Sequence, residues 1–116
     1  MNKSINRLNN ILRYCNRIEE TMNEFGIDVE DFFENVTYHD VCSFYITQLG
    51  ENVKSLPAEL TQKYPEIHWK GISGMRDVIS HGYEKINLET IWIFIIEEVP
   101  MLKDTCEKIL REIETT

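Results

Sequence analysis

The chain has 116 residues, of which 42% are hydrophobic and 28% are charged, and these values describe one ordinary globular domain. Its net charge of −8 argues against a freestanding nucleic-acid-binding protein, because such proteins usually carry a basic surface. The amino terminus has no apolar signal-peptide core, and the longest apolar run, Ile91–Ile96, is far shorter than the roughly 20 residues that span a bilayer. We expect a single domain over residues 1–116 that is cytoplasmic and has no membrane anchor.

Hydrophobic residues recur at three- and four-residue steps along the whole chain, which predicts an all-α fold. The first helix is expected to extend over about 20 residues and to end at Gly26, after which Asp28 can cap a short helix. Thr37 and Asp40 resemble a capping box that opens a longer helix. The predicted buried face of that helix consists of Val41, Phe44, Tyr45, Gln48, Leu49 and Val53.

In the second half of the chain, Pro57 can begin a short helical turn, and Tyr64-Pro65 marks a break. A helix is predicted from about residue 66 to residue 81 and ends at Gly82. A last helix is predicted from about residue 88 to residue 112, with a kink at Pro100. The whole pattern indicates an up-and-down bundle of four main helices with short helical turns.

Two features of the last two helices indicate a homodimer. Gly71 and Gly74 lie inside the helix predicted over residues 66–81, where each costs about 1 kcal/mol relative to alanine and is usually tolerated because another backbone comes close. The segment Ile91–Ile96 is apolar nearly all round, which indicates burial on two sides. A domain of this size has one core, so we expect the second apolar side to contact a second copy.

The three cysteines, Cys15, Cys42 and Cys106, are far apart and include no C-x-x-C pair, and the three histidines show no metal-ligand spacing. We expect the cysteines to be small core residues. We expect neither a metal nor a cofactor.

Residues 74–83 contain the motif R-x-x-x-x-H-x-Y, formed by Arg76, His81 and Tyr83. Arginine offers a permanent cation and a donor fork that suit phosphate oxygens, and histidine can move protons near neutral pH. These are the groups that metal-free phosphodiester cleavage needs. Asp77 lies one helical turn before His81, so its carboxylate could orient the imidazole. By themselves the same residues also fit a structural interpretation, in which the arginine and histidine are ordinary helix-surface residues.

The acidic charge is unevenly distributed, because residues 1–17 contain four basic residues and no acidic one. Of these, Arg13 and Arg17 lie one turn apart and are candidate RNA contacts, although solvated helix positions explain them equally well.

The block Trp69-x-x-Ile72-x-Gly74-Met75-Arg76-Asp77-x-x-x-His81-x-Tyr83, followed by Leu88, Trp92 and Pro100, resembles the HepT-like branch of the HEPN superfamily. Gly50-Glu51-x-Val53-Lys54-x-Leu56 is similar to the second long helix of that branch, and His68 departs from it, because proline commonly stands there.

This resemblance implies an all-α homodimer that acts as a metal-independent endoribonuclease, the toxin of a type II toxin–antitoxin pair. Arg76 and His81 would be catalytic, with Asp77 in support, at a cleft shared by two subunits. The implied partner is an MntA-type minimal nucleotidyltransferase antitoxin, which would transfer AMP from ATP to Tyr83. Two alternatives remain: a non-catalytic HEPN subunit that binds nucleotide or substrate for a nucleotidyltransferase, and a purely structural dimerisation module.

Overall fold

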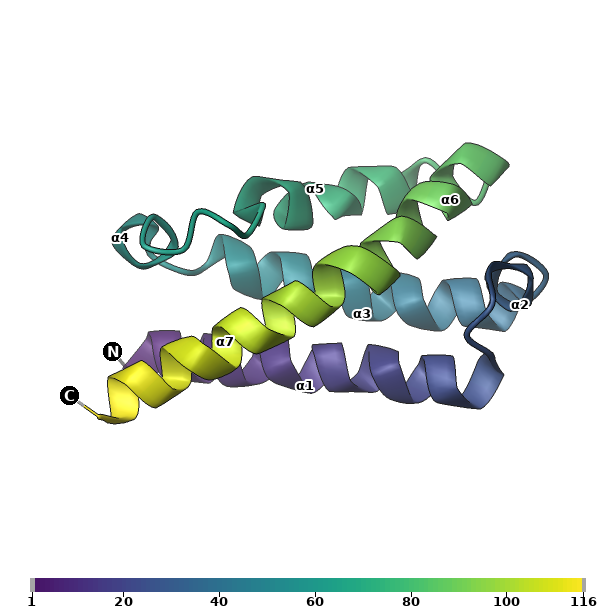
Figure 1. Ribbon diagram of the computed structural model, residues 1–116. Helices are drawn as coiled ribbons and strands as arrows, with labels where there is room; N and C mark the ends of the chain where they lie inside the picture. The colour runs from purple at the N-terminus through teal and green to yellow at the C-terminus, as the bar shows by residue number, and fades with distance from the viewer. Residues whose placement is uncertain (1, 116) are drawn as a thin grey trace.

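A computed structural model describes residues 2–115, and within this range the chain is helical with short connections, as the sequence predicted (Figure 1). Three of the main rods are α1 (Asn2–Phe25), α3 (Val36–Lys54) and α5 (Trp69–Ser80). The fourth is a continuous rod of α6 (Lys85–Ile93), the π-helical turn η1 (Phe94–Glu98) and α7 (Val99–Glu114). Two short helices, α2 (Val29–Phe33) and α4 (Ala58–Thr61), lie in the connections. The predicted up-and-down bundle is therefore confirmed.

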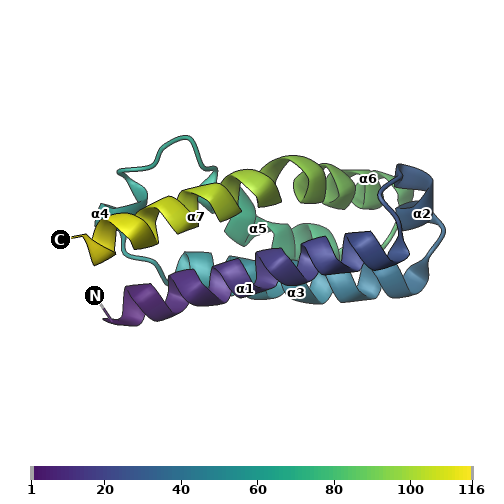
Figure 2. The ribbon, with the colours of Figure 1, turned by 60° about the horizontal axis from the view of Figure 1, so that its bottom comes forward.

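Helix α3 occupies the middle of the bundle, between α1 and α5 (Figures 1 and 2). Helix α1 packs on α3 and α7, whereas α5 packs on α3 and α6. The result is an elongated body of 46 × 26 × 21 Å. The helix that carries the motif is thus supported by α3, which is distant from it in the sequence, and by α6, which follows it directly.

The connection from α1 to α3 follows the predicted stop and cap, with one shift. Gly26 adopts a φ of +126°, a conformation that side chains disfavour, and its N–H donates to Met22 O at 2.8 Å. Asp28 caps α2 as expected. The cap of α3 is Asn35, whose side-chain oxygen accepts a hydrogen bond from the Tyr38 N–H at 3.1 Å. The predicted start at Thr37 was therefore wrong by two residues, because asparagine is an equally good N-cap.

The predicted buried face of α3 was partly wrong. Phe44 is 57% exposed, while Cys42 and Ile46 are fully buried, and Leu49 and Val53 are buried as expected. Apolar residues occur on more than one side of this helix, so periodicity alone could not select the side that faces the core. The side of α3 that is buried is determined by its position between α1 and α5.

Within one chain, a close helix–helix contact occurs at Gly50. The predicted contact of Gly71 and Gly74 with a second copy stays a prediction. A Cβ added at Gly50 of α3 would lie 3.2 Å from Ile72 O and 3.3 Å from Ser73 Cα. Gly71 and Gly74 both lie on the exposed side of α5, and a Cβ at Gly74 would meet no atom within 4 Å among the described residues. Within one chain, therefore, the glycine that admits a neighbouring backbone is Gly50.

The last rod departs from regular α-helix immediately before Pro100, where the sequence predicted a kink. Proline has no N–H to donate to the carbonyl of Ile96, and its ring crowds that carbonyl, so a wider π turn over Phe94–Glu98 accommodates it. Ile93 and Ile96 are 51% and 44% exposed, whereas Ile95 is buried. The predicted second apolar side thus exists, and it faces outward from the chain.

The three cysteines are buried, as expected, and burial raises the pKa of both Cys42 and Cys106 to about 12. They are therefore inert thiols at neutral pH. In the described part of the chain, none of the helices has the length and apolar character needed to cross a membrane.

Candidate functional site

The motif occupies the last turn of α5 and the connection that follows it. Helix α5 begins after His68, whose carbonyl accepts the N–H of Ile72 at 3.0 Å, and Ile72 and Met75 anchor the helix in the core. It ends at Gly82, whose φ of +90° is readily adopted by glycine alone, and the Gly82 N–H donates to Ile79 O at 3.1 Å. This local geometry places Arg76 on the helix and His81 at its C-terminal cap.

Arg76 is exposed and reaches toward α3. Its Nη1 lies 3.4 Å from Glu51 Oε1, and the two side chains are 69% and 49% exposed. A pair this exposed contributes little stability, because water screens both charges. The guanidinium is therefore held only loosely and can meet an incoming anion.

His81 is exposed, and its Nδ1 lies 2.5 Å from the backbone carbonyl oxygen of Asp77. A carbonyl oxygen only accepts hydrogen bonds, so Nδ1 carries the proton in this contact and Nε2 of the neutral ring is an acceptor. The sequence suggested that the Asp77 carboxylate would orient the imidazole. The imidazole instead contacts the backbone carbonyl of Asp77, and this contact leaves Nε2 free to accept a proton.

Tyr83 lies just past Gly82, and its half-buried ring packs on α3. The ring meets His39 in an edge-to-face arrangement, with centroids 5.3 Å apart and an interplanar angle of 63°. Burial raises the pKa of the Tyr83 hydroxyl, and the Asp40 carboxylate raises it further, while Ser43 opposes this effect. Tyr83 is therefore only partly exposed at the position that follows the motif helix.

Sequence reasoning missed the residues that α3 contributes to this region. Glu51 contacts Arg76, and His39, Asp40 and Ser43 surround Tyr83. One signal was available, because His39 and Ser43 are polar residues one turn apart on this helix. Their neighbours on α5 could not be deduced from spacing along the chain.

The two remaining candidates, Arg13 and Arg17, lie on the exposed side of α1. The Arg13 guanidinium lies over the ring of Tyr14, 5.0 Å from its centroid. Because α3 lies between α1 and α5, these arginines belong to a different face from the motif.

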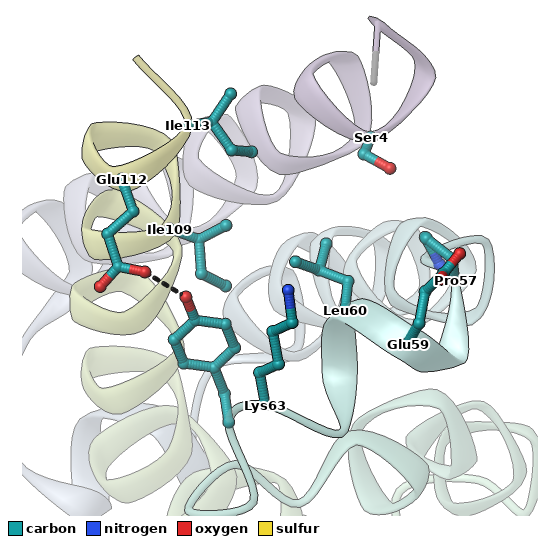
Figure 3. A pocket seen from close by; sticks show the side chains of 9 residues that line it. Ser4, Pro57, Glu59, Leu60, Lys63, Ile109, Glu112 and Ile113 are labelled. Carbon is teal, nitrogen blue, oxygen red and sulfur yellow. Dashed lines mark hydrogen bonds between the residues drawn. The ribbon is translucent and has the colours of Figure 1, made fainter. Parts of the chain in front are cut away.

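A cleft of about 570 Å³ lies at the other end of the bundle, beside α4 and the two termini (Figure 3). Leu60, Ile109 and Ile113 form an apolar part of its wall. The Tyr64 hydroxyl donates to Glu112 Oε2 at 2.5 Å at this cleft. None of the motif residues lines it, so it is separate from the candidate site.

Comparison with known proteins points to one family. A family profile described as ribonuclease HepT-like matches residues 11–109. A protein of Caldanaerobacter subterraneus subsp. tengcongensis named as a candidate RNase is 34% identical over 105 residues, which cover 90% of this chain and 92% of that protein. Another candidate RNase, from Methanocaldococcus jannaschii, is 35% identical over 96 residues, which are 75% of this chain and 79% of that protein.

A further relative, from Thermococcus cleftensis, carries the name "Probable ribonuclease HepT" and is 28% identical over 90 residues. These cover 70% of this chain and 82% of that protein. No solved structure matches the chain significantly.

Proposed function

This chain belongs to the ribonuclease HepT-like family, and we propose that it is a metal-independent endoribonuclease, the toxin of a type II toxin–antitoxin pair. The observation that carries the proposal is the arrangement at the end of α5, where an exposed, loosely held arginine precedes an exposed histidine with an accepting Nε2. The names of the relatives support the same activity.

Cleavage of RNA without a metal requires activation of the 2′-hydroxyl, stabilisation of the pentavalent phosphorane and protonation of the leaving 5′-oxygen. His81 Nε2 would accept the 2′-hydroxyl proton, and an imidazolium would return a proton to the leaving oxygen. Arg76 would stabilise the charge that develops on the phosphate oxygens. Asp77 supports this chemistry by holding Nδ1 of His81 through its carbonyl.

One proton acceptor and one proton donor are needed at the same phosphate, whereas each chain has one histidine in the motif. A homodimer would supply both, with the two copies of Arg76 and His81 facing a shared cleft. The outward apolar side chains of Ile93 and Ile96 and the uncovered Gly74 support such an interface.

Silencing is proposed to occur at Tyr83, through an MntA-type minimal nucleotidyltransferase that transfers AMP from ATP to the phenol oxygen. Tyr83 lies two residues beyond His81, so an attached AMP would add a negative charge and a bulky base beside the RNA path. The added phosphate would also compete with RNA for Arg76.

The test is cleavage of RNA by the purified chain in EDTA. Arg76→Ala and His81→Ala should each lower the rate by about 100-fold or more, because transition-state charge stabilisation and proton transfer each contribute at least this much. Both side chains are exposed, so the helical circular dichroism should be unchanged. The products should end in 2′,3′-cyclic phosphates. A strict requirement for Mg²⁺ would overturn the mechanism.

One observation favours the alternative of a non-catalytic subunit that binds nucleotide or substrate for a nucleotidyltransferase. The surroundings of Arg76 are acidic, with Glu51 in contact and Asp77 next in the sequence, and the whole chain carries a charge of −8. Such a protein would bind nucleotide but would cleave no RNA. Absence of growth arrest on expression without the partner would support this alternative.

A further inference from the structure

A row of one guanidinium and three aromatic rings crosses from α1 to α3. The Arg13 guanidinium lies over the Tyr14 ring, 5.0 Å from its centroid, and Nη2 of Arg13 donates to the Tyr14 hydroxyl at 3.3 Å. The Tyr14 and Tyr45 ring centroids are 5.9 Å apart. The Tyr45 and Phe44 centroids are 5.7 Å apart, in an edge-to-face arrangement. We call these four side chains the aromatic row.

The packing of the bundle explains only the middle of the aromatic row. Tyr14 and Tyr45 are half-buried, as rings between two packed helices are, but Arg13 is exposed and Phe44 is 57% exposed. An exposed phenyl ring contributes little to folding, because most of its apolar surface stays in water. The row therefore presents aromatic surface and a cation to the solvent side by side.

The side of α1 that carries Tyr14 is basic. It holds three exposed cations at steps of three, seven and eleven residues from Tyr14, which are close to whole helical turns, and these are Arg17, Arg7 and Lys3. On α3, by contrast, the exposed carboxylates of Asp40 and Glu51 precede and follow Phe44 on the same side of the helix. An anionic strand would therefore follow α1 and reach α3 only with its uncharged groups.

We propose that the aromatic row is a binding surface for single-stranded RNA, on which bases stack on the rings while the cations of α1 contact phosphates. Aromatic side chains combined with a basic track are the usual means of holding a single strand, because every base has a face that can stack. The inference rests on the proposed function for its choice of RNA, since it adds a second contact with the same substrate.

This surface is separate from the residues proposed to cleave RNA. Arg13 and Tyr14 lie on α1, whereas Arg76 lies on α5 and His81 at its end, and α3 lies between the two helices (Figure 1). The aromatic row would therefore hold a part of the strand away from the phosphate that is cleaved. Its contribution is affinity, which a chain with a net charge of −8 needs for an anionic substrate.

The first experiment measures binding of a fluorescent oligouridine of about 12 nucleotides by anisotropy, with the His81→Ala chain as the parent so that the RNA stays uncut. Phe44→Leu should weaken binding about fivefold or more, because it keeps an apolar side chain but removes the face on which a base stacks. Phe44→Trp should bind at least as tightly as the parent. The matched control is Ile27→Ala, which shortens a side chain that is 68% exposed in the connection after α1 and should bind like the parent. Unchanged binding by Phe44→Leu would overturn the inference.

The second experiment changes the ligand instead of the protein. A sugar–phosphate oligomer of the same length without bases should bind the parent about fivefold or more weakly than the oligouridine, since it keeps the charge and loses the stacking. Equal binding of the two oligomers would overturn the inference. Light scattering should give the same mass for Phe44→Leu as for the parent. A lower mass would assign Phe44 to a contact between copies of the chain and would also overturn the inference.

These results separate the new surface from the proposed function. If wild type cuts no RNA but binding depends on Phe44, the proposed cleavage fails and the binding surface is supported. If wild type cuts RNA but binding does not depend on Phe44, the binding surface alone fails.

Discussion

At the scale of single residues, the contacts around Arg76 show that its charge contributes little to the stability of the fold. The Arg76–Glu51 pair is 3.4 Å long and mostly exposed, so it contributes less than about 1 kcal/mol to folding. Hydrogen bonds from arginine to a phosphate are charge-assisted and frequently bidentate, and they are stronger than a screened surface pair. A phosphate could therefore displace Glu51 at small cost.

A short side-chain hydrogen bond lies elsewhere in the bundle, where the Tyr64 hydroxyl donates to Glu112 Oε2 at 2.5 Å. Tyr64→Phe should lower the free energy of unfolding at pH 7 by about 1 kcal/mol, because it removes this one hydrogen bond while keeping the ring. Urea denaturation measures the difference.

The same variant makes a pH prediction. The hydrogen bond to Glu112, together with burial, raises the pKa of Tyr64 from 10.0 to about 12. A raised pKa means that the contribution to stability is complete below pH 10 and is lost as the pH rises through about 12. The stability difference between wild type and Tyr64→Phe should therefore shrink over this window. A difference that stays constant to pH 12 would contradict the assignment.

At the scale of elements, the contact between α3 and α5 decides the position of the motif helix. Gly50 allows the backbone of α5 to come close at Ile72 and Ser73, and this contact is formed by backbone atoms that cannot rotate away. The motif at the end of α5 is therefore set at a defined distance from Glu51 of α3. The glycine on α3, rather than those on α5, positions the site within one chain.

Two alanine substitutions should separate these roles. Gly50→Ala should destabilise the protein despite the gain of about 1 kcal/mol in helix propensity, because its Cβ would press on the backbone of α5 at 3.2 Å. Gly74→Ala meets no atom within 4 Å in the described chain, so it should raise the stability of the monomer by up to about 1 kcal/mol. Thermal unfolding at low protein concentration measures both changes. Equal effects of the two substitutions would contradict the importance of the Gly50 contact.

At the scale of the whole molecule, an outward apolar surface remains on the last rod. Ile93, Ile96 and Met101 are 51%, 44% and 44% exposed. Exposed apolar side chains that form a patch commonly mark a surface that binds another protein. This surface and the uncovered side of α5 are the parts of the chain that we expect a second copy to cover.

The homodimer is tested by light scattering at micromolar concentration. Wild type should give the mass of two chains, and Ile93→Asp should give the mass of one, because a charge cannot be buried unpaired at an apolar interface. Ile93 is exposed within one chain, so the variant should keep its fold. A wild-type monomer under these conditions would contradict the dimer.

RNA must bind despite the net charge of −8 of the chain. We expect the basic residues of the acid-free segment 1–17 to contribute to this binding. Arg13→Glu with Arg17→Glu should weaken RNA binding and should reduce the slope of log affinity against log salt by about 1.4, if each arginine contacts one phosphate of single-stranded RNA. Filter binding over a range of salt concentrations measures this slope. Binding that does not change would identify both arginines as solvated positions on α1.

The sequence by itself determined the all-α fold, the helix ends at Gly26 and Gly82 and the helix that carries Arg76 and His81. These features depend on residues a few positions apart, whose geometry the helix prescribes. Only the tertiary structure decided which side of α3 is buried, that Gly50 admits α5, that Glu51 meets Arg76 and that Tyr83 rests on His39 beside Asp40. These contacts join helices far apart in the sequence, and their register depends on how the whole bundle packs, which no local spacing records.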